Sequence, residues 1–376
     1  MAKLDKKLLH ERLADHLRDE IQQSRSHGEK FDTELELADR FDVSVGTVRQ
    51  AVLTLCNEGL LRRRQGSGTF VRKTTGRGLV AVLTGRHLER QDSYFFVKLA
   101  SLLQERLDAE SLACRQVTGI CGAENTESAT RSAFVSEVES GKFTGCLGVG
   151  IRPRRWLQEL LDENDVPLVG ASTSIYDYRV RADQQHMIRQ AVQFLVERNR
   201  RRLGILHPTD HATENEVDDP HVRAFKHALE GTDVPFRRER VFGCINPTSA
   251  DNGWADFRRL WRNSPARPDG LIICDDCLFR DAAPAILAHD IKVPEDLLIV
   301  THANRGSGVV YPFPTARMEY DPGRFADEMV DMLLDLVNER DAVGPENVVD
   351  FRWRGIRDID RALDTALVHG PASAME

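Results

Sequence analysis

Apolar residues recur at helical spacing through the first 60 residues of the chain. The first set stands at intervals of four with charged residues between its members, which predicts an amphipathic helix ending near residues 24–28. Its members are Leu9, Leu13, Leu17 and Ile21. A second, shorter helix is expected after a cap at Asp32 or Thr33.

A third helix is predicted after a tight connection at residues 42–43. Ser44 is suited to cap it, and an i, i+3, i+4, i+7 stripe marks its buried face: Val48, Ala51, Val52 and Leu55. Two short helices joined by about three residues form a helix-turn-helix. The outward face of this helix then carries Thr47, Arg49 and Gln50. An arginine placed in the major groove of DNA favours guanine. The helix start at Ser44 suits a phosphate oxygen.

The segment LLRRRQGSGTFV, residues 60–71, predicts a β-hairpin with a basic flank. Its glycine-rich tip has no bulky side chain and can enter a narrow groove, while the arginines beside it neutralise phosphates. The residues assigned to this contact are Arg62, Arg63, Arg64, Gln65, Gly66, Ser67, Gly68 and Thr69. An ordinary connector is the competing interpretation of the hairpin alone, and its place directly after a helix-turn-helix favours a DNA-binding wing.

Composition supports this division of the chain. The first 76 residues hold 14 Lys and Arg against 12 Asp and Glu, whereas the whole chain of 376 residues carries a net charge of −8. The start lacks the apolar segment of a signal peptide, and no stretch approaches the roughly 18 apolar residues of a membrane span. We therefore expect a cytoplasmic protein without membrane contact, in which the seven cysteines, an odd number, are reduced thiols.

The segment ELADRFDVSVGTVRQAVLTLCNEGLLRRRQGSGTFV carries short motifs in the order and spacing of one family. Through them residues 8–72 resemble the winged-helix head of the GntR family of bacterial transcription regulators. Leu35 and Val45 stand where that family often has arginine. The resemblance implies that two contacts to DNA are absent, so Thr47, Arg49 and the wing carry more of the contact.

From residue 79 onward, apolar runs of strand length alternate with helical segments. Buried parallel strands are expected at 79–84, 145–150, 166–172, 201–208, 269–276 and 296–303, with helices at 97–109, 155–163, 187–198, 221–229 and 323–338. This alternation predicts a doubly wound α/β fold, in which ligands bind beyond the carboxyl ends of the strands. We assign residues 1–72 to the DNA-binding domain, 73–78 to a linker, 79–356 to the α/β domain and 357–376 to a C-terminal tail.

Several α/β segments, among them VPLVGAS and IKVPEDLLIVTHA, follow the landmarks of a second family. The α/β domain is similar to the effector-binding domain of LacI/GalR repressors, a periplasmic-binding-protein-like domain of type I. The resemblance implies two subdomains, joined by several crossovers, that hold a small ligand in a cleft. The combination of this domain with a GntR head is similar to arabinose-responsive repressors.

The same resemblance implies effector contacts at Tyr94, Phe95, Asp183, His221, Arg223, Asp276, Glu319 and Tyr320. His221 or Arg223 would replace an arginine of the family, and the late contact is either Glu319 or Tyr320. Acidic and aromatic groups together suit a polyhydroxylated, carbohydrate-like ligand. These departures leave a simple sugar open to question, and a cap or a loop pairing is the competing role for each residue.

Other motifs are weaker. Cys274 and Cys277 have the spacing of a redox or half-zinc motif but lack a second cysteine pair. The polar segment 207–211 could supply metal ligands, although an ordinary strand exit would look the same. The glycines of 145–150 do not form a dinucleotide fingerprint. We expect no metal, no cofactor and no enzymatic activity. The sequence predicts a homodimeric repressor that binds operator DNA under control of a small effector. The alternatives are a metabolic enzyme with a DNA-binding head and a DNA-binding protein whose cleft has lost its ligand.

Overall fold

The computed structural model describes residues 8–25, 29–58, 60–64, 68–71, 78–85, 94–121, 129–171, 176–209, 219–244, 252–263, 267–338 and 343–368. The chain divides into two compact units, each assembled from segments distant in the sequence. Unit 1 contains Met1–Arg86, Leu103–Arg179 and Met329–Pro345. Unit 2 contains His87–Leu102, Val180–Glu328 and Glu346–Glu376.

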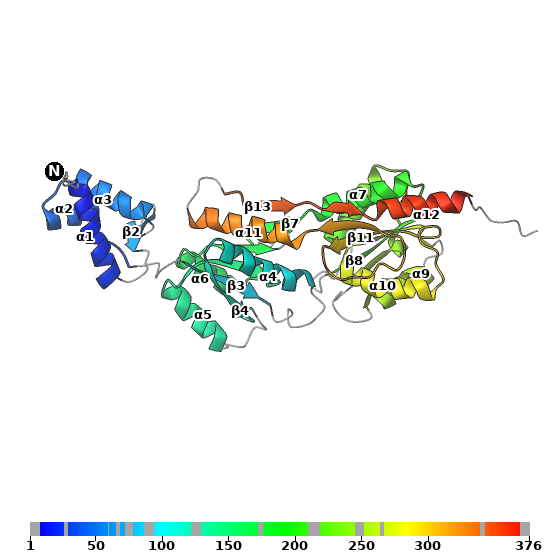
Figure 1. Ribbon diagram of the computed structural model, residues 1–376, viewed down its shortest axis with the longest axis horizontal. Helices are drawn as coiled ribbons and strands as arrows, with labels where there is room; N and C mark the ends of the chain where they lie inside the picture. Colours follow the sequence, from blue (N-terminus) through cyan, green and yellow to red (C-terminus); the bar gives the residue numbers. More distant parts are fainter. Residues whose placement is uncertain are drawn as a thin grey trace, which may run out of the picture. The chain divides into compact units, whose positions relative to one another are not determined.

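The N-terminal head consists of helices and one hairpin (Figure 1). Its elements are α1 (Leu9–Ser24), α2 (Glu34–Phe41), α3 (Val45–Asn57), β1 (Leu61–Arg64) and β2 (Gly68–Val71). Thr33 and Glu36 form a capping box at the start of α2, and the Ser44 hydroxyl accepts a hydrogen bond from Thr47 N at 3.1 Å. Of the two candidate caps for the second helix, Thr33 is therefore the one used.

The head has its own hydrophobic core. The α3 stripe is buried as predicted, and α1 contributes three of its four stripe residues, because Leu9 in the first turn is 55% exposed. The hairpin contributes Leu61 and Val71 to this core. The buried set is Leu13, Ala14, Leu17, Ile21, Phe31, Leu37, Ala38, Val48, Ala51, Val52, Leu55, Leu61 and Val71. Burial of these side chains, rather than helix propensity, holds such short helices together.

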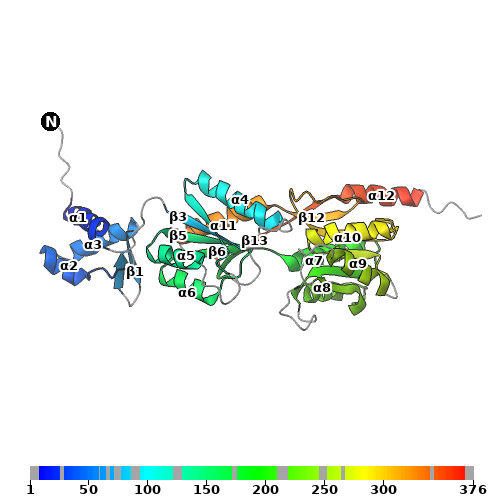
Figure 2. The ribbon, with the colours of Figure 1, turned by 90° about the horizontal axis from the view of Figure 1, so that it is seen from below.

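The first large sheet has the strand order β13-β7-β6-β5-β3-β4. Its strands are β3 (Leu79–Thr84), β4 (Ala113–Thr118), β5 (Phe143–Val149), β6 (Leu168–Ala171), β7 (Tyr178–Ala182) and β13 (Glu346–Val349). Strands β4, β3, β5 and β6 pair in parallel. The helices are α4 (Tyr94–Ala109), α5 (Ala129–Glu139), α6 (Arg155–Glu163) and α11 (Pro322–Val337). Figure 2 shows α5 and α6 on the face of this sheet opposite to α4.

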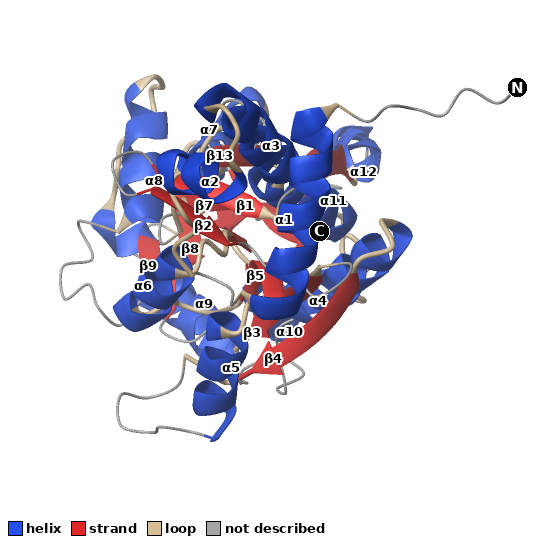
Figure 3. Cartoon of the chain, turned by 90° about the vertical axis from the view of Figure 1, so that its left-hand side faces the viewer, coloured by secondary structure: helices blue, strands red, loops and turns tan. Residues whose placement is uncertain are grey.

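The second large sheet has the strand order β14-β12-β11-β10-β8-β9. Its strands are β8 (Leu203–Pro208), β9 (Val241–Cys244), β10 (Gly270–Ile273), β11 (Leu298–Asn304), β12 (Ala316–Tyr320) and β14 (Arg352–Arg354). All pair in parallel except β14, which runs antiparallel to β12. The helices are α7 (Gln184–Glu197), α8 (Pro220–Glu230), α9 (Asn252–Asn263), α10 (Asp276–Ala288) and α12 (Ile356–Val368), with a 3₁₀ turn at Arg238–Arg240. Figure 1 shows α7 and α12 on one face of this sheet and α9 and α10 on the other, and Figure 3 separates helices from strands by colour.

The predicted fold class, a winged helix-turn-helix head with a doubly wound α/β region, is confirmed. Residues 357–376, assigned to a tail, contain most of α12, whose Ile359 is fully buried. Within the described part of the chain, no helix is long and apolar enough to cross a membrane.

Two glycines in neighbouring strands make room for one aromatic ring. Gly148 of β5 pairs with Gly170 of β6, and the Tyr176 ring lies over both. A Cβ added at Gly148 would stand 2.7 Å from Tyr176 Cε1, inside van der Waals contact. The Tyr176 hydroxyl donates a hydrogen bond to Ile151 O at 2.9 Å. Gly148 and Gly170 therefore serve packing of this ring.

We predict that Gly148→Ala lowers the free energy of unfolding by about 1–3 kcal/mol, because the new methyl group overpacks the Tyr176 ring. Tyr176→Ala alone is expected to be destabilising, and the two changes together to cost less than the sum of the single ones. Chemical denaturation of the four proteins of this cycle measures the coupling. Additive effects would show that the alanine clashes with something other than this ring.

Candidate functional sites

The outward face of α3 carries the predicted groove-reading residues. Arg49 and Gln50 are exposed, and the Arg49 side chain keeps 62% of its surface. Thr47 is half-buried, and its hydroxyl lies 2.8 Å from the Ser44 hydroxyl. Ser44 is thus occupied as the cap of α3, while Arg49 and Gln50 remain accessible to a partner.

Glu34, the first residue of α2, joins the exposed face of α3 to the hairpin. Its carboxylate accepts hydrogen bonds from Arg49 Nε at 3.0 Å and from Arg63 Nη2 at 2.5 Å. All three side chains are partly exposed. An ion pair of this kind adds little stability, but it restricts where the two guanidinium groups point. The sequence gives no short-range signal for it, because Glu34 and Arg49 are 15 residues apart.

The predicted hairpin is present, and β1 and β2 pair antiparallel. Arg63 lies opposite Thr69 and Arg64 opposite Gly68. Gly68 has φ +121°, a conformation that favours glycine, and Thr69 O accepts a hydrogen bond from Phe31 N at 2.8 Å. Of the predicted wing residues, Gln65, Gly66 and Ser67 lie outside the described residues, as do the side chains of Arg62 and Arg64.

In unit 2, polar side chains follow the carboxyl ends of the parallel strands. Asp276 begins α10 after β10, is 5% exposed, and accepts a hydrogen bond at 3.0 Å from Asn304 at the end of β11. Tyr320, the last residue of β12, is 1% exposed. Asn304 Oδ1 and the Tyr320 hydroxyl have no hydrogen-bond partner among the described residues. Buried polar atoms of this kind are costly unless a ligand or another group satisfies them.

A hollow of about 680 Å³ opens beside Asp276 within unit 2. Tyr94, Asp276, Arg280 and Ser307 supply polar groups to its lining, and much of the remainder is apolar. Burial, followed by the charge of Asp276, raises the pKa of Tyr94, and the same causes raise the pKa of Tyr311 to about 12. Both phenols are therefore neutral hydrogen-bond donors at pH 7.

The structure brings together only part of the predicted effector set. Tyr94 and Asp276 line the hollow, whereas Phe95 packs edge-on against Phe325. Asp183 caps α7 by accepting from His186 N at 2.9 Å, and Glu319 accepts from Arg354 at 3.1 Å. These two residues thus have the local roles that the sequence left open for them.

The remaining two predicted residues lie on α8. Arg223 is exposed beside α7, whereas His221 is buried. Asn304, which no motif indicated, lies one residue beyond the predicted strand 296–303. Its position at a strand end is the signal that would have identified it.

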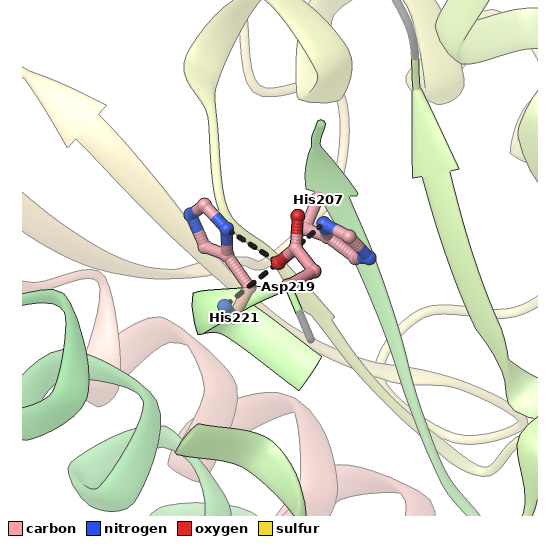
Figure 4. A group of neighbouring side chains, drawn as sticks. All are labelled: His207, Asp219 and His221. Carbon is pink, nitrogen blue, oxygen red and sulfur yellow. Dashed lines mark hydrogen bonds and ion pairs between the residues drawn. The ribbon is translucent and has the colours of Figure 1, made fainter. Parts of the chain in front are cut away.

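A second polar cluster lies at the end of β8, where His207, Asp219 and His221 meet (Figure 4). Asp219 Oδ1 is 3.1 Å from His221 Nδ1 and 3.5 Å from His207 Nδ1, and it also accepts from His221 N at 2.8 Å. Burial lowers the pKa of His207 to about 4. Burial alone would raise the pKa of Asp219, but the hydrogen bond from His221 and the nearby imidazoles hold it at about 2.

The Cys274 to Cys277 segment marks the start of α10. Burial raises the pKa of both thiols, and neighbouring carboxylates add to the effect. Asp275 between them caps α10 by accepting from Cys277 N and Leu278 N. The motif is thus a helix start rather than a thiolate site.

Comparisons with known proteins agree with this architecture. Residues 9–71 match the family of bacterial regulatory proteins described as the gntR family, and residues 192–354 match the periplasmic binding protein-like domain. The chain therefore joins a gntR-family helix-turn-helix domain to a periplasmic-binding-protein-like domain, as its resemblances implied. Over 54 residues it is 50% identical to the HTH-type transcriptional regulator YurK of Bacillus subtilis (strain 168), a match that covers 14% of this chain and 22% of that relative.

Solved structures of regulators share the fold. The transcriptional regulator CelR in complex with cellobiose is similar with a TM-score of 0.60 and 16% identity, over 86% of this chain and 98% of that one. A LacI family transcriptional regulator from Lactobacillus casei with bound sucrose has a TM-score of 0.56 and 17% identity, over 74% and 98%. CcpA of Lactococcus lactis has a TM-score of 0.58 and 15% identity, over 75% and 98%. Identities this low support the fold alone.

We predict that Tyr320→Phe raises the free energy of unfolding by about 1–3 kcal/mol, because it removes a buried hydroxyl that lacks a partner. The matched control, Tyr176→Phe, removes a hydroxyl bonded to Ile151 O and is expected to lower stability by about 1 kcal/mol. Denaturant titration of both variants in ligand-free protein checks the contrast. A destabilised Tyr320→Phe would mean that this hydroxyl is paired in the free protein.

Proposed function

We propose that the protein is a transcription regulator that binds operator DNA as a homodimer through its head and releases it when unit 2 binds a small, carbohydrate-like effector. The observation that carries the proposal is Arg49, exposed on α3 and tied through Glu34 to Arg63 of the hairpin. These groups belong to a domain of the gntR family. No turnover is required of the protein in this role.

The head supports DNA binding through two kinds of contact. Arg49 and Gln50 supply side chains for base edges in the major groove. The arginines of β1 supply charge for phosphates, a contact that fixes position rather than sequence. Glu34 limits the freedom of one arginine of each kind, so less conformational entropy is lost when DNA binds.

Unit 2 supports binding of a polyhydroxylated ligand. Asp276 is an acceptor for hydroxyl groups and Tyr94 is a neutral donor with an aromatic face, and both line the hollow. Asn304 donates to Asp276, and its Oδ1 has no hydrogen-bond partner among the described residues. The similar regulators bound to cellobiose and to sucrose favour a carbohydrate. A coupling of about 1–3 kcal/mol between the two sites is enough to change operator occupancy.

The homodimer is supported by the symmetry of its expected DNA site. A dimer matches the two-fold symmetry of operators that helix-turn-helix proteins bind.

We predict that Arg49→Ala costs about 1–3 kcal/mol of operator affinity, because a bidentate arginine contact discriminates between bases by that amount. A duplex is first selected from a randomised library with the full chain, and gel-shift titration then gives affinity, sequence preference and the number of chains per duplex. We expect two chains on a two-fold site.

The control for this measurement is Arg155→Ala, which removes a 91% exposed arginine from α6. It should leave operator affinity unchanged. Equal affinity and unchanged sequence preference in Arg49→Ala would remove the role assigned to α3, and failure to enrich any duplex would remove the proposed function itself.

We predict that at least one sugar, sugar acid or polyol stabilises the full chain in a thermal-shift screen. A ligand at 100 times its Kd adds about 2.7 kcal/mol to the free energy of unfolding. Asp276→Asn should abolish the shift, because the amide cannot replace the carboxylate as a two-oxygen acceptor. The control Asp233→Asn removes an exposed partner of Arg201 and should retain it.

Two outcomes of the screen favour the alternative functions. A compound that is consumed during incubation would indicate an enzyme, since a regulator returns its effector unchanged. No stabilisation by any compound, in a protein that still selects DNA, would indicate a DNA-binding protein without an effector.

Operator binding that is strengthened rather than weakened by the stabilising compound would contradict release.

A further inference from the structure

We propose that His207, Asp219 and His221 form a binding site for a divalent transition-metal ion in unit 2. The three side chains come from the end of β8, the residue before α8 and the second residue of α8. One donor atom from each lies within 4.8 Å of the other two, and all three residues are buried. Figure 4 shows the carboxylate between the two imidazole rings.

The spacing of the donor atoms fits a small ion. Bond lengths of about 2.0–2.2 Å around a tetrahedral ion separate neighbouring ligand atoms by roughly 3.3 Å. The two Nδ1 atoms lie 3.1 and 3.5 Å from Asp219 Oδ1, on either side of this value. The rings are stacked with centroids 5.2 Å apart and an interplanar angle of 25°, and the Nδ1 atom of each lies within 3.5 Å of Asp219 Oδ1.

Hydrogen bonds alone do not satisfy the cluster. His207 Nδ1 lies 3.0 Å from Pro208 O and 3.5 Å from Asp219 Oδ1, and it can carry one hydrogen for these two acceptors. His221 Nε2 is a buried atom without a hydrogen-bond partner among the described residues, so ligation by the Nδ1 atom of this ring gives up only its contact with Asp219. The buried carboxylate of Asp219 also carries a negative charge that a cation would compensate.

A neighbouring hydroxyl orients the carboxylate. Thr209 Oγ1 donates to Asp219 Oδ2 at 3.1 Å and leaves Oδ1 directed to the histidines. Metal sites commonly hold their ligands through such outer hydrogen bonds. Two imidazoles and one carboxylate suit zinc and its neighbours in the first transition row, and a set of three protein ligands leaves a coordination position for water or an oxygen of a bound ligand.

The test uses the full-length chain without an affinity tag, stripped with a chelator and free of DNA. Cobalt(II) serves as a spectroscopic probe, and zinc(II) is titrated by calorimetry and in competition with cobalt. We expect one ion per chain, visible ligand-field bands of a four-coordinate cobalt ion, and displacement of cobalt by zinc. Because the imidazoles must be deprotonated to bind, affinity should fall at acidic pH.

Three substitutions remove one ligand each: His207→Gln, Asp219→Asn and His221→Gln. Each should weaken zinc affinity by at least about 100-fold. Loss of a residue that only orients a ligand costs up to about that factor, and these residues are the ligands themselves. Asp219→Asn is the most informative variant, because asparagine caps a helix as well as aspartate does and the start of α8 is retained. Circular dichroism and denaturation confirm that each variant is folded.

The matched control is His227→Gln, which removes an exposed histidine from the same helix, α8. It should bind zinc as the wild type does. Uptake that persists unchanged in folded Asp219→Asn, or the absence of any bound ion at micromolar protein and metal, would overturn the proposal. Either result leaves the proposed DNA and effector binding intact, since neither measurement depends on them.

Discussion

The structure of unit 2 depends on one constraint. Polar groups at the carboxyl edge of the second sheet are buried away from water. Parallel strands end at one edge, so the residues that follow β8, β10, β11 and β12 are brought together whatever their distance in sequence. Three polar residues are buried there with few hydrogen-bond partners: Asp276, Asn304 and Tyr320. Their desolvation costs free energy, and burial of the apolar strands beneath them offsets that cost. Buried polar groups without partners among the described residues are tolerated at this edge because the apolar core below it is large.

In the head, burial of apolar side chains holds the elements together, and one carboxylate sets the direction of two arginines. Glu34 lies at the start of α2, where the helix dipole favours an anion. It accepts hydrogen bonds from Arg49 of α3 and Arg63 of β1, so it links three elements of the head.

The repeated apolar spacing made the head and the buried strands predictable. The stripe of α3, the cap at Ser44 and the strand at Leu79–Thr84 were all evident in the sequence, because each depends on neighbours within one turn or one strand. Strand β4 was not predicted, since it is mostly half-buried or exposed and lacks a continuous apolar run. The cluster of His207 with Asp219 was missed for a different reason, because twelve residues separate the two and the contact exists only once α8 packs beside β8.

The head completes its hydrophobic core within one continuous stretch of chain, residues 13–71, whereas each α/β unit is assembled from segments that alternate along the sequence. A gene fragment encoding the head can therefore be exchanged by recombination at a single junction without exposing apolar surface. No single junction within residues 103–345 has that property. Exchange of the head would thus replace the helix-turn-helix and hairpin in one genetic event and leave the α/β segments of both units unchanged.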